Sequence, residues 1–295
     1  MNPDTPSRSR EYNGPITRAA RWDAYRPRAG DIIVSAPAKS GMTWIQAICA
    51  MLIFGRADIG VQPAKLSPWF DSTFEPLGPM LKRLEAQTHR RYLKTHTPLD
   101  GLPYFPEVHY LAVYRHPLDA FHSAAALAQA AARGRLPAQP GVPTDIRSYM
   151  LECIRTPLSK IVGEQLSVAS VANHFSGFWT YRALPNIHLF HYADMTRDLR
   201  GSIASIASAL GIAVDERTVA AMADAAGFAN MQARARQFVP ASDGGWKDPR
   251  EFFRSGTGGQ WKGVLNEDDL AEYRRAYEAA IPDPAAAAWL ENGNG

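Results

Sequence analysis

A short basic loop stands between an apolar run and a helical pattern near the start of the chain. Residues 31–37 are mostly apolar and end at a proline, which is typical of a buried strand that leads into a turn. Residues 43–54 carry apolar side chains at helical spacing, and Lys39, Ser40 and Gly41 lie between the two segments. Loop amides and the positive end of a helix can meet at one point, where a lysine adds a mobile charge. The segment therefore predicts a site for a phosphate-like group.

This loop does not have the order of the common nucleoside-triphosphate loop. That motif reads Gly-x4-Gly-Lys-Ser/Thr, and the hydroxyl after its lysine holds magnesium. Here the order is Lys-Ser-Gly, and the early glycine is missing. A basic strand-to-helix turn without a ligand is the alternative interpretation of this segment taken alone.

Residues 109–123 repeat the pattern of strand, turn and helix. Arg115 stands where the strand should end, Pro117 suits the first turn of a helix, and Ser123 lies further along that helix. A guanidinium offers a planar fork of donors that matches a phosphate group, and a serine offers a hydroxyl. The segment therefore supplies a second set of candidate phosphate ligands.

A lysine and a histidine lie two residues apart in a short strand pattern, residues 92–98. Side chains at positions i and i+2 of a strand point to the same face, so Lys94 and His96 could enter one cavity. An unperturbed histidine titrates near pH ~6.5 and can accept a proton at neutral pH. A buried, hydrogen-bonded strand histidine is the alternative interpretation of His96.

Together these segments resemble the sulfotransferases that use 3'-phosphoadenosine 5'-phosphosulfate (PAPS), particularly the cytosolic type. The family's phosphosulfate loop, Tyr-Pro-Lys-Ser-Gly-Thr-Thr-Trp, resembles residues 36–44, with an inserted alanine and with Met42 in place of the first threonine. The other matching blocks, in the family's order, are residues 94–96, 112–119, 189–195 and 254–262.

The resemblance implies an α/β fold: a single domain with a central, mostly parallel sheet flanked by helices, in the P-loop-like sulfotransferase architecture. We expect residues 22–290 to form this sulfotransferase domain and residues 1–21 to form a polar N-terminal lead-in. Apolar runs alternate with helical patterns, as in β-α-β units. The predicted strands are 31–36, 91–96, 109–114 and 187–192, and the predicted helices are 43–54, 79–87, 117–133, 145–155, 165–183, 198–210, 215–225 and 267–280. The predicted loops are 134–142 and 236–260.

The activity that the resemblance implies is in-line transfer of the sulfuryl group of PAPS to a hydroxyl or amine of a small, apolar acceptor. Such a transfer needs an aligned nucleophile, a cradle for the moving oxygens and help for the leaving phosphate. The resemblance assigns the catalytic roles to His96 as the general base, Lys39 at the leaving phosphate, and Lys94 beside them. PAPS is the implied co-substrate, and no metal is implied, because no histidine pair has a zinc-ligand spacing with a nearby carboxylate or cysteine.

The resemblance also assigns the groups that bind the nucleotide. The 5'-phosphosulfate loop comprises Lys39, Ser40, Gly41, Met42, Thr43 and Trp44. The 3'-phosphate ligands are Arg115, Ser123 and Arg254, helped by Ser255 and Gly256, and Ser255 stands where the family often has lysine. Trp44 and Phe228 would sandwich the adenine, and the other adenine-side residues are Tyr192, Met231 and Phe253. Each of these aromatic residues, taken alone, is also typical of a core.

The acceptor pocket is assigned to Trp69 and Phe70, which resemble a family loop, and to Leu127. Where the family has a run of aromatics after its serine, this chain has Ala124–Ala126 and Leu127, which implies a wider or differently shaped pocket. The aromatic residues could equally be ordinary core. The sequence does not name the acceptor.

Composition limits the classes of function. The chain has 295 residues, a formal charge of +3 and no cluster of basic residues, so nucleic acid is not an expected partner. Its two cysteines make no disulfide framework, and its longest apolar runs fall short of the ~18 residues that a membrane helix needs. No secretory pattern is visible at the start of the chain, so we expect a cytoplasmic protein without a transmembrane segment.

Two other classes of protein, and the mode of dimer assembly, are also considered from the sequence. A P-loop small-molecule kinase would need a magnesium-binding hydroxyl and an acidic strand end, neither of which is clear. A catalytically silent nucleotide-binding protein of the same fold would have no need of both Lys39 and His96. The family's dimer segment reads Lys-x-x-x-Thr-Val-x-x-x-Glu; because Asn266, Glu267 and Ala271 replace its last three signature residues, we do not expect that dimer contact.

Overall fold

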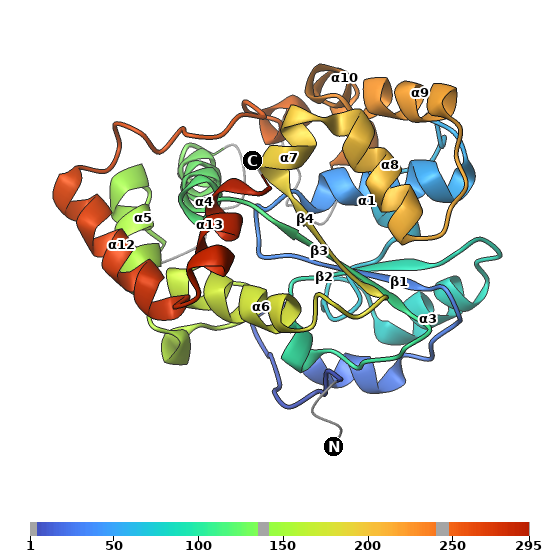
Figure 1. The fold of residues 1–295 in the computed structure, drawn as a ribbon, viewed down its shortest axis with the longest axis horizontal. Coiled ribbons are helices and arrows are strands. Elements are labelled where there is room, and N and C mark those ends of the chain that lie inside the picture. Colours follow the sequence, from blue (N-terminus) through green and yellow to red (C-terminus); the bar gives the residue numbers. More distant parts are fainter. Residues whose placement is uncertain (1–4, 135–141, 240–247, 295) are drawn as a thin grey trace.

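Four parallel strands form the centre of the computed structural model, which describes residues 5–134, 142–239 and 248–294 (Figure 1). The strands are β1 (Ile32–Ser35), β2 (Tyr92–Thr95), β3 (His109–Tyr114) and β4 (Ile187–His191). Their order in the sheet is β2-β1-β3-β4, and every neighbouring pair is parallel. All four strands lie where the sequence predicts them, and the predicted α/β fold with one parallel sheet is confirmed.

The helices have bounds close to the predicted ones where their apolar period is long. The α-helices are α1 (Met42–Phe54), α2 (Pro63–Leu66), α3 (Leu77–Glu85), α4 (Pro117–Ala132), α5 (Ile146–Arg155), α6 (Val168–Thr180), α7 (Tyr192–Arg197), α8 (Leu199–Ala209), α9 (Glu216–Ala226), α10 (Phe228–Ala233), α11 (Ala235–Phe238), α12 (Glu267–Ala280) and α13 (Pro284–Asn292). Short 3-10 turns are η1 (Ala19–Ala24), η2 (Leu99–Gly101), η3 (Leu158–Lys160) and η5 (Pro249–Phe252). The predicted loop 134–142 lies almost entirely outside the described residues. The predicted loop 236–260 is described at 236–239 and 248–260, where it contains the end of α11 and the turn η5.

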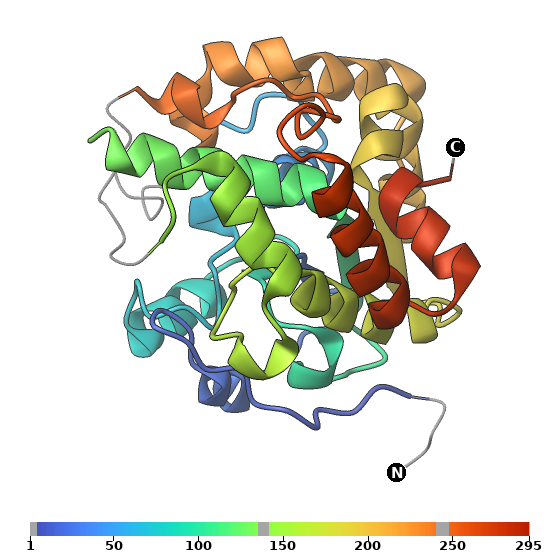
Figure 2. The ribbon, with the colours of Figure 1, turned by 90° about the vertical axis from the view of Figure 1, so that its left-hand side faces the viewer.

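The sheet buries both of its faces, as expected for parallel strands. Successive residues of a strand face opposite sides, so Ile33 belongs to one core cluster, and Ile32 and Val34 belong to the other. Helices α1, α8 and α9 cover the second face, while α4, α6, α12 and α13 lie over the first (Figure 1). Figure 2 shows α4, α5, α6 and α12 packed against one another on that first side.

The structure differs from the sequence prediction at the boundary between β4 and α7 and at α13. β4 ends at His191 rather than at residue 192, because the His191 side chain accepts a hydrogen bond from the Ala193 amide and so caps α7. Tyr192 is therefore the first residue of a helix instead of the last residue of a strand. The sequence analysis missed α13, although Asp283 caps it and Pro284 occupies its first turn, which is a recognisable start signal.

The strand order places a topological switch point at the carboxyl ends of β1 and β3. β1 lies between β2 and β3, so the connections that leave these strands run to opposite sides of the sheet. In open parallel sheets, ligands bind outside the strand ends at this switch point. The loop after β1, residues 36–41, and Arg115, directly after β3, both belong to this edge.

The N-terminal segment packs against the rest of the chain. Thr17 pairs with Ser72 in an isolated antiparallel bridge, and Tyr12 donates a hydrogen bond to Asp100 (2.8 Å). Trp22 is buried in the first core cluster. Among the described residues, no helix is both long enough and apolar enough to cross a membrane.

Candidate active site

The backbone of the loop after β1 is held in an unusual conformation. Lys39 has a φ of 66°, and it is the only residue other than glycine with a positive φ in the described part of the chain. Such a conformation costs about 1–3 kcal/mol and persists where the surrounding structure imposes it, often at functional sites. Two residues later, Gly41 has a φ of 108° and little room for a Cβ, because the Tyr192 ring would lie 3.1 Å from it. The loop is thus folded tightly into the start of α1.

The start of α1 is open to an anion. Gly41 is its N-cap and provides no side-chain hydrogen bond, and the first turn contains no acidic residue. Met42 is 5% exposed and belongs to the second core cluster, so only its main chain faces the loop. Uncapped amides at a helix N-terminus attract negative charge. The first turn of α1 therefore favours an anion through its main-chain amides.

Two arginines from distant parts of the chain meet beside this loop. Arg254 donates a hydrogen bond to Nδ1 of His122 (3.2 Å) and another to Gln260 (2.8 Å), and burial and then the charge of Arg115 lower its pKa. Arg115 donates to the Thr257 carbonyl (3.0 Å), but its buried Nε has no hydrogen-bond partner. Neither guanidinium forms an ion pair with a carboxylate among the described residues. Two like charges held together with an unused donor form a site that favours an anion.

The glycine-rich segment that carries Arg254 is held in place by Asp119 of α4. The Asp119 carboxylate accepts a hydrogen bond from the Gly259 amide (2.7 Å), and a Cβ on Gly258 would lie 2.9 Å from the same carboxylate. Gly256, with a φ of 65°, leaves room for the Phe228 ring, which would lie 2.4 Å from a Cβ there. The glycines of this segment are thus explained by close contacts. Sequence analysis assigned no role to Asp119 beyond its match to a family block.

Tyr192 connects the loop and the arginines. Its ring packs against Gly41, the Arg115 guanidinium lies 4.4 Å from the ring centroid, and the Trp44 ring lies 5.2 Å away at a steep angle. Trp44 donates from its indole N–H to the carbonyl of Ala226 (2.9 Å). Trp44 is thereby fixed next to the start of α10, where Phe228 is the first residue. The structure thus brings Lys39–Trp44, Arg115, Tyr192 and Phe228 to one edge of the sheet.

His96 is neutral, and its ring is oriented as a general base requires. Its Nδ1 lies 2.6 Å from the carbonyl of Ala36, which can only accept a hydrogen bond, so Nδ1 carries the proton. Burial, and then the nearby ammonium of Lys94, lower the pKa of His96 to about 3. The imidazole is therefore neutral at physiological pH, with its lone pair on Nε2. Lys39 also lowers this pKa, which places both lysines in the electrostatic surroundings of the base.

Of the two aromatics predicted for the acceptor pocket, Trp69 is the one that lies beside His96 and Lys94. Its ring lies 4.9 Å from the His96 ring, and the Lys94 ammonium lies 4.6 Å from its centroid. Phe70, the next residue, is fully buried and packs on Trp22 and Tyr25 in the first core cluster. Neighbouring residues of this extended segment face opposite ways. We therefore keep Trp69 in the acceptor assignment and leave Phe70 out of it.

The remaining predicted residues occupy different surroundings. Met231 is 2% exposed and lies in the second core cluster, so its part in the site is to support α10. The Phe253 carbonyl accepts a hydrogen bond from Gln232 (2.6 Å), and Ser255 accepts one from Gln260. Three further predicted residues, Thr43, Ser123 and Leu127, are half-buried.

A second buried histidine, which was not predicted from the sequence, joins the ends of β1 and β3. His174 of α6 is 2% exposed, lies 2.8 Å from the Ser35 hydroxyl at the end of β1, and lies 2.9 Å from the Tyr114 hydroxyl at the end of β3. Burial lowers the pKa of His174 to about 3. This network ties together the carboxyl ends of the two strands that carry the loops. No sequence motif marks His174, because its partners are far apart in the chain.

These neutral histidines make stability depend on pH. A group whose folded pKa is lowered binds its proton first in the unfolded state, so the free energy of unfolding falls as pH falls below its unfolded pKa. Burial lowers the pKa of His174 to about 3 and that of His188 to about 4. The fully buried His174 alone costs up to about 1.4 kcal/mol per pH unit below about pH 6.5, and the partly exposed His188 costs less. We expect urea titrations from about pH 7.5 to about pH 5.5 to show a falling free energy of unfolding; a rise over this range would contradict the assigned protonation states.

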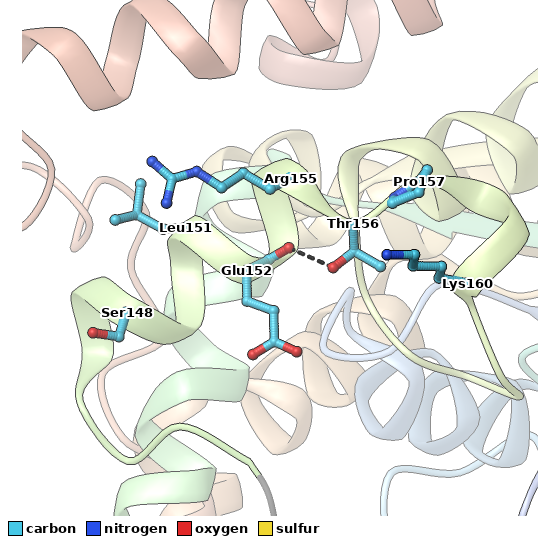
Figure 3. A pocket seen from close by; sticks show the side chains of 7 residues that line it. All are labelled: Ser148, Leu151, Glu152, Arg155, Thr156, Pro157 and Lys160. Atoms are coloured by element: carbon cyan, nitrogen blue, oxygen red, sulfur yellow. Dashed lines mark hydrogen bonds between the residues drawn. The ribbon is translucent and has the colours of Figure 1, made fainter.

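A hollow in the described surface lies away from these groups. It measures about 410 Å³ and lies over α5 and η3 (Figure 3). Its lining residues are Ser148, Leu151, Glu152, Arg155, Thr156, Pro157 and Lys160. None of them belongs to the predicted site, and Arg155 is paired with Glu272 (2.8 Å). Among the described residues, no group of three or more histidine, cysteine or acidic side chains could hold a metal ion.

The sequence matches a known protein family and its members. The family model described as "Sulfotransferase domain" matches residues 29–285. A glycolipid sulfotransferase of Mycobacterium bovis is 34% identical over 325 aligned positions, which cover 99% of this chain and 98% of that protein. A glycolipid sulfotransferase of Mycobacterium tuberculosis is 35% identical over 323 positions, which cover 99% and 98%.

A solved structure shares the fold. The crystal structure of a mouse sulfotransferase, SULT7A1, complexed with PAP superimposes with a TM-score of 0.71. The match covers 92% of this chain and 91% of the mouse chain at 18% identity. At that identity the likeness concerns the fold, which agrees with the four-stranded parallel sheet described above.

Proposed function

This chain belongs to the sulfotransferase domain family, and we propose that it transfers the sulfuryl group of PAPS to a hydroxyl of a glycolipid-like acceptor. The observation that carries the proposal is the pair of guanidiniums, Arg115 and Arg254, beside an uncapped helix start. One anion site for each end of a doubly phosphorylated nucleotide is what PAPS requires. Family membership argues against the kinase alternative.

The residues present fit PAPS at both of its charged ends. The unused Nε of Arg115 supports a 3'-phosphate ligand between Arg115 and Arg254, with Ser123 as a further donor. The loop Lys39–Trp44 would hold the 5'-phosphosulfate with main-chain amides and the Lys39 ammonium. When bound, PAPS supplies the activated sulfuryl group.

The adenine would lie between the aromatic residues at the top of α1 and α10. Trp44 is fixed by its hydrogen bond to the Ala226 carbonyl, and the Phe228 ring packs closely against Gly256. Flat aromatic faces suit a purine ring. Tyr192, which contacts both Trp44 and Arg115, would join the adenine side to the 3'-phosphate side.

His96 would take the proton of the acceptor hydroxyl on Nε2 while that oxygen attacks. The bond from Nδ1 to the Ala36 carbonyl fixes the tautomer and orients the ring. Burial is the main reason for the lowered pKa of His96, and the charges of Lys94 and Lys39 lower this pKa further. The negative charge of a bound nucleotide would offset the effect of the two lysines. Lys39 and Lys94 would stabilise the charge that develops on the transferred group and the leaving phosphate.

The acceptor class comes from the mycobacterial relatives, which are named glycolipid sulfotransferases. Trp69, between Lys94 and His96, offers a flat apolar face next to the base. A sugar ring stacks well on such a face and keeps its hydroxyls free for the base. A glycolipid-like acceptor is therefore a more specific proposal than the small, apolar acceptor that the resemblance implied.

A labelled-donor assay tests this function. We expect the purified protein to move labelled sulfate from PAPS to a glycolipid extract or an alkyl glycoside and to release PAP in equal amount. Labelled ATP in the same reaction serves as the control, because the loop lacks the nucleoside-triphosphate order. Transfer of phosphate from ATP, with none of sulfate from PAPS, would overturn the proposal.

A further inference from the structure

Unpaired polar atoms gather next to the proposed base. Six buried side-chain polar atoms of the described residues have no hydrogen-bond partner, and they belong to Thr17, Trp69, Asp71, Gln87, Arg115 and Glu164. The one on Arg115 lies in the proposed 3'-phosphate site. Four of the others, on Thr17, Trp69, Asp71 and Glu164, belong to three segments that meet in space. Buried polar groups are normally paired, so a cluster of unpaired ones calls for a partner.

Backbone contacts show how these segments meet. Trp69 forms an isolated parallel bridge with Lys94, and Thr17 forms an antiparallel bridge with Ser72. Gly14 lies so close to Gly163 that a Cβ on Gly14 would be 2.6 Å from the Gly163 Cα. The segments 14–17, 69–72 and 163–164 therefore converge near the end of β2, which carries Lys94 and is followed directly by His96.

Two carboxyl groups form the centre of the cluster. Asp71 is 1% exposed; its Oδ2 accepts hydrogen bonds from Thr95 and Thr97, both at 2.7 Å, whereas its Oδ1 has no partner. Glu164 also has an unpaired buried oxygen, Oε2. Burial and the negative charge of Asp71 raise the pKa of Glu164, and the charge of Lys94 lowers it. Glu164 is thus within electrostatic reach of both Asp71 and Lys94.

We propose that Glu164 accepts a hydrogen bond from a second hydroxyl of the acceptor, with Asp71 behind it, so that this enzyme selects polyhydroxylated head groups. The inference rests on the proposed function and names the residue that sets its acceptor class. Carboxylate oxygens need donors, and a sugar presents several hydroxyls near the one that reacts. An acceptor with a single hydroxyl offers its only O–H to His96 and leaves Glu164 and Asp71 unpaired. Leaving buried polar groups unpaired is what rejects such a ligand.

The rim of this cluster is apolar, which suits the tail of such an acceptor. Phe74 is 50% exposed and packs against Trp69 with ring centroids 5.8 Å apart. Val162, two residues before Glu164, is 48% exposed. The suitable probes are therefore octyl β-D-glucoside and octan-1-ol, which share an alkyl chain and a primary hydroxyl but differ in the additional hydroxyls.

The test compares kcat/KM for the two acceptors at saturating PAPS, measured as PAP released. We expect the wild type to prefer the glucoside, and Glu164→Ala to lower kcat/KM for the glucoside roughly 10- to 100-fold, as for a lost bond to a charged group, with little change for octan-1-ol. Glu164→Gln, which keeps a carbonyl oxygen, should retain more of the preference. The control is Glu152→Ala, a carboxylate in the remote hollow of Figure 3, which should change neither value.

Other outcomes overturn the inference. An equal loss with both acceptors, accompanied by a lower melting temperature or weaker PAP binding, would make Glu164 a structural residue. No loss with either acceptor would remove it from acceptor recognition. Absence of PAP release by the wild type with both acceptors and with the glycolipid extract would instead count against the proposed function and would take the inference with it.

Discussion

His96→Ala is expected to lower kcat by about 10²–10⁴-fold while the affinity for PAP stays nearly unchanged. The reason is geometric. Nδ1 is held by the Ala36 carbonyl, so Nε2 is the only position of the ring that can take a proton from the acceptor. Steady-state kinetics with PAPS and calorimetry with PAP measure the two quantities separately.

The matched control for His96 is His188→Ala. Burial lowers the pKa of His188 to about 4, so it too is a neutral, partly buried histidine of the sheet. It pairs in register with Leu111 near the start of β4, at the other end of the strands from the loops, and we expect it to keep kcat. Full activity of His96→Ala would remove His96 from the mechanism, and collapse of PAP binding in that variant would make its role structural.

Arg254→Ala and Arg115→Ala are each expected to weaken PAP binding roughly 10- to 100-fold, because a hydrogen bond to a charged group is worth about 1.5–3 kcal/mol. The same changes should leave the affinity for adenosine 5'-phosphate nearly unchanged, since that nucleotide has no 3'-phosphate. Arg155→Ala, in the hollow of Figure 3, is the control for the loss of an exposed arginine and should affect neither ligand.

A stability measurement separates a binding role from a structural one for Arg254. Without a ligand, burial and then the charge of Arg115 lower the pKa of Arg254, so the two guanidiniums repel each other. Removing Arg254 should therefore not lower the melting temperature of the free protein, and PAP should stabilise the wild type more than the variant. A variant that melts well below the wild type without ligand would indicate that Arg254 holds the fold through His122 and Gln260 instead.

Sequence alone could predict the parts of the site that are contiguous in the chain. The loop around Lys39 and the segment of Arg115 each combine a strand end with a helix start, and local patterns report such turns well. The strand that carries Lys94 and His96 is equally local, and its alternation placed both side chains on the face of Trp69.

Contacts between distant segments could not be predicted in this way. His174 meets Ser35 across 139 residues, and Glu164 comes within electrostatic reach of Asp71 only in the folded chain. The aromatic pair Trp69 and Phe70 shows a related limit, because a one-residue difference in an extended segment sends one ring to the site and the other to the core. Asn266 is a further case: it caps α12 through a hydrogen bond from the Asp269 amide (2.9 Å), so the segment that replaces the family's dimer signature serves to start a helix.

The most direct test of the account is a calorimetric comparison of PAP with adenosine 5'-phosphate on the unmodified protein. The two nucleotides differ only in the 3'-phosphate, for which Arg115 and Arg254 are the proposed ligands. We expect PAP to bind roughly 100-fold more tightly or better, because two charge-assisted contacts are added. Equal affinities of the two nucleotides would contradict the assignment of this site to PAPS.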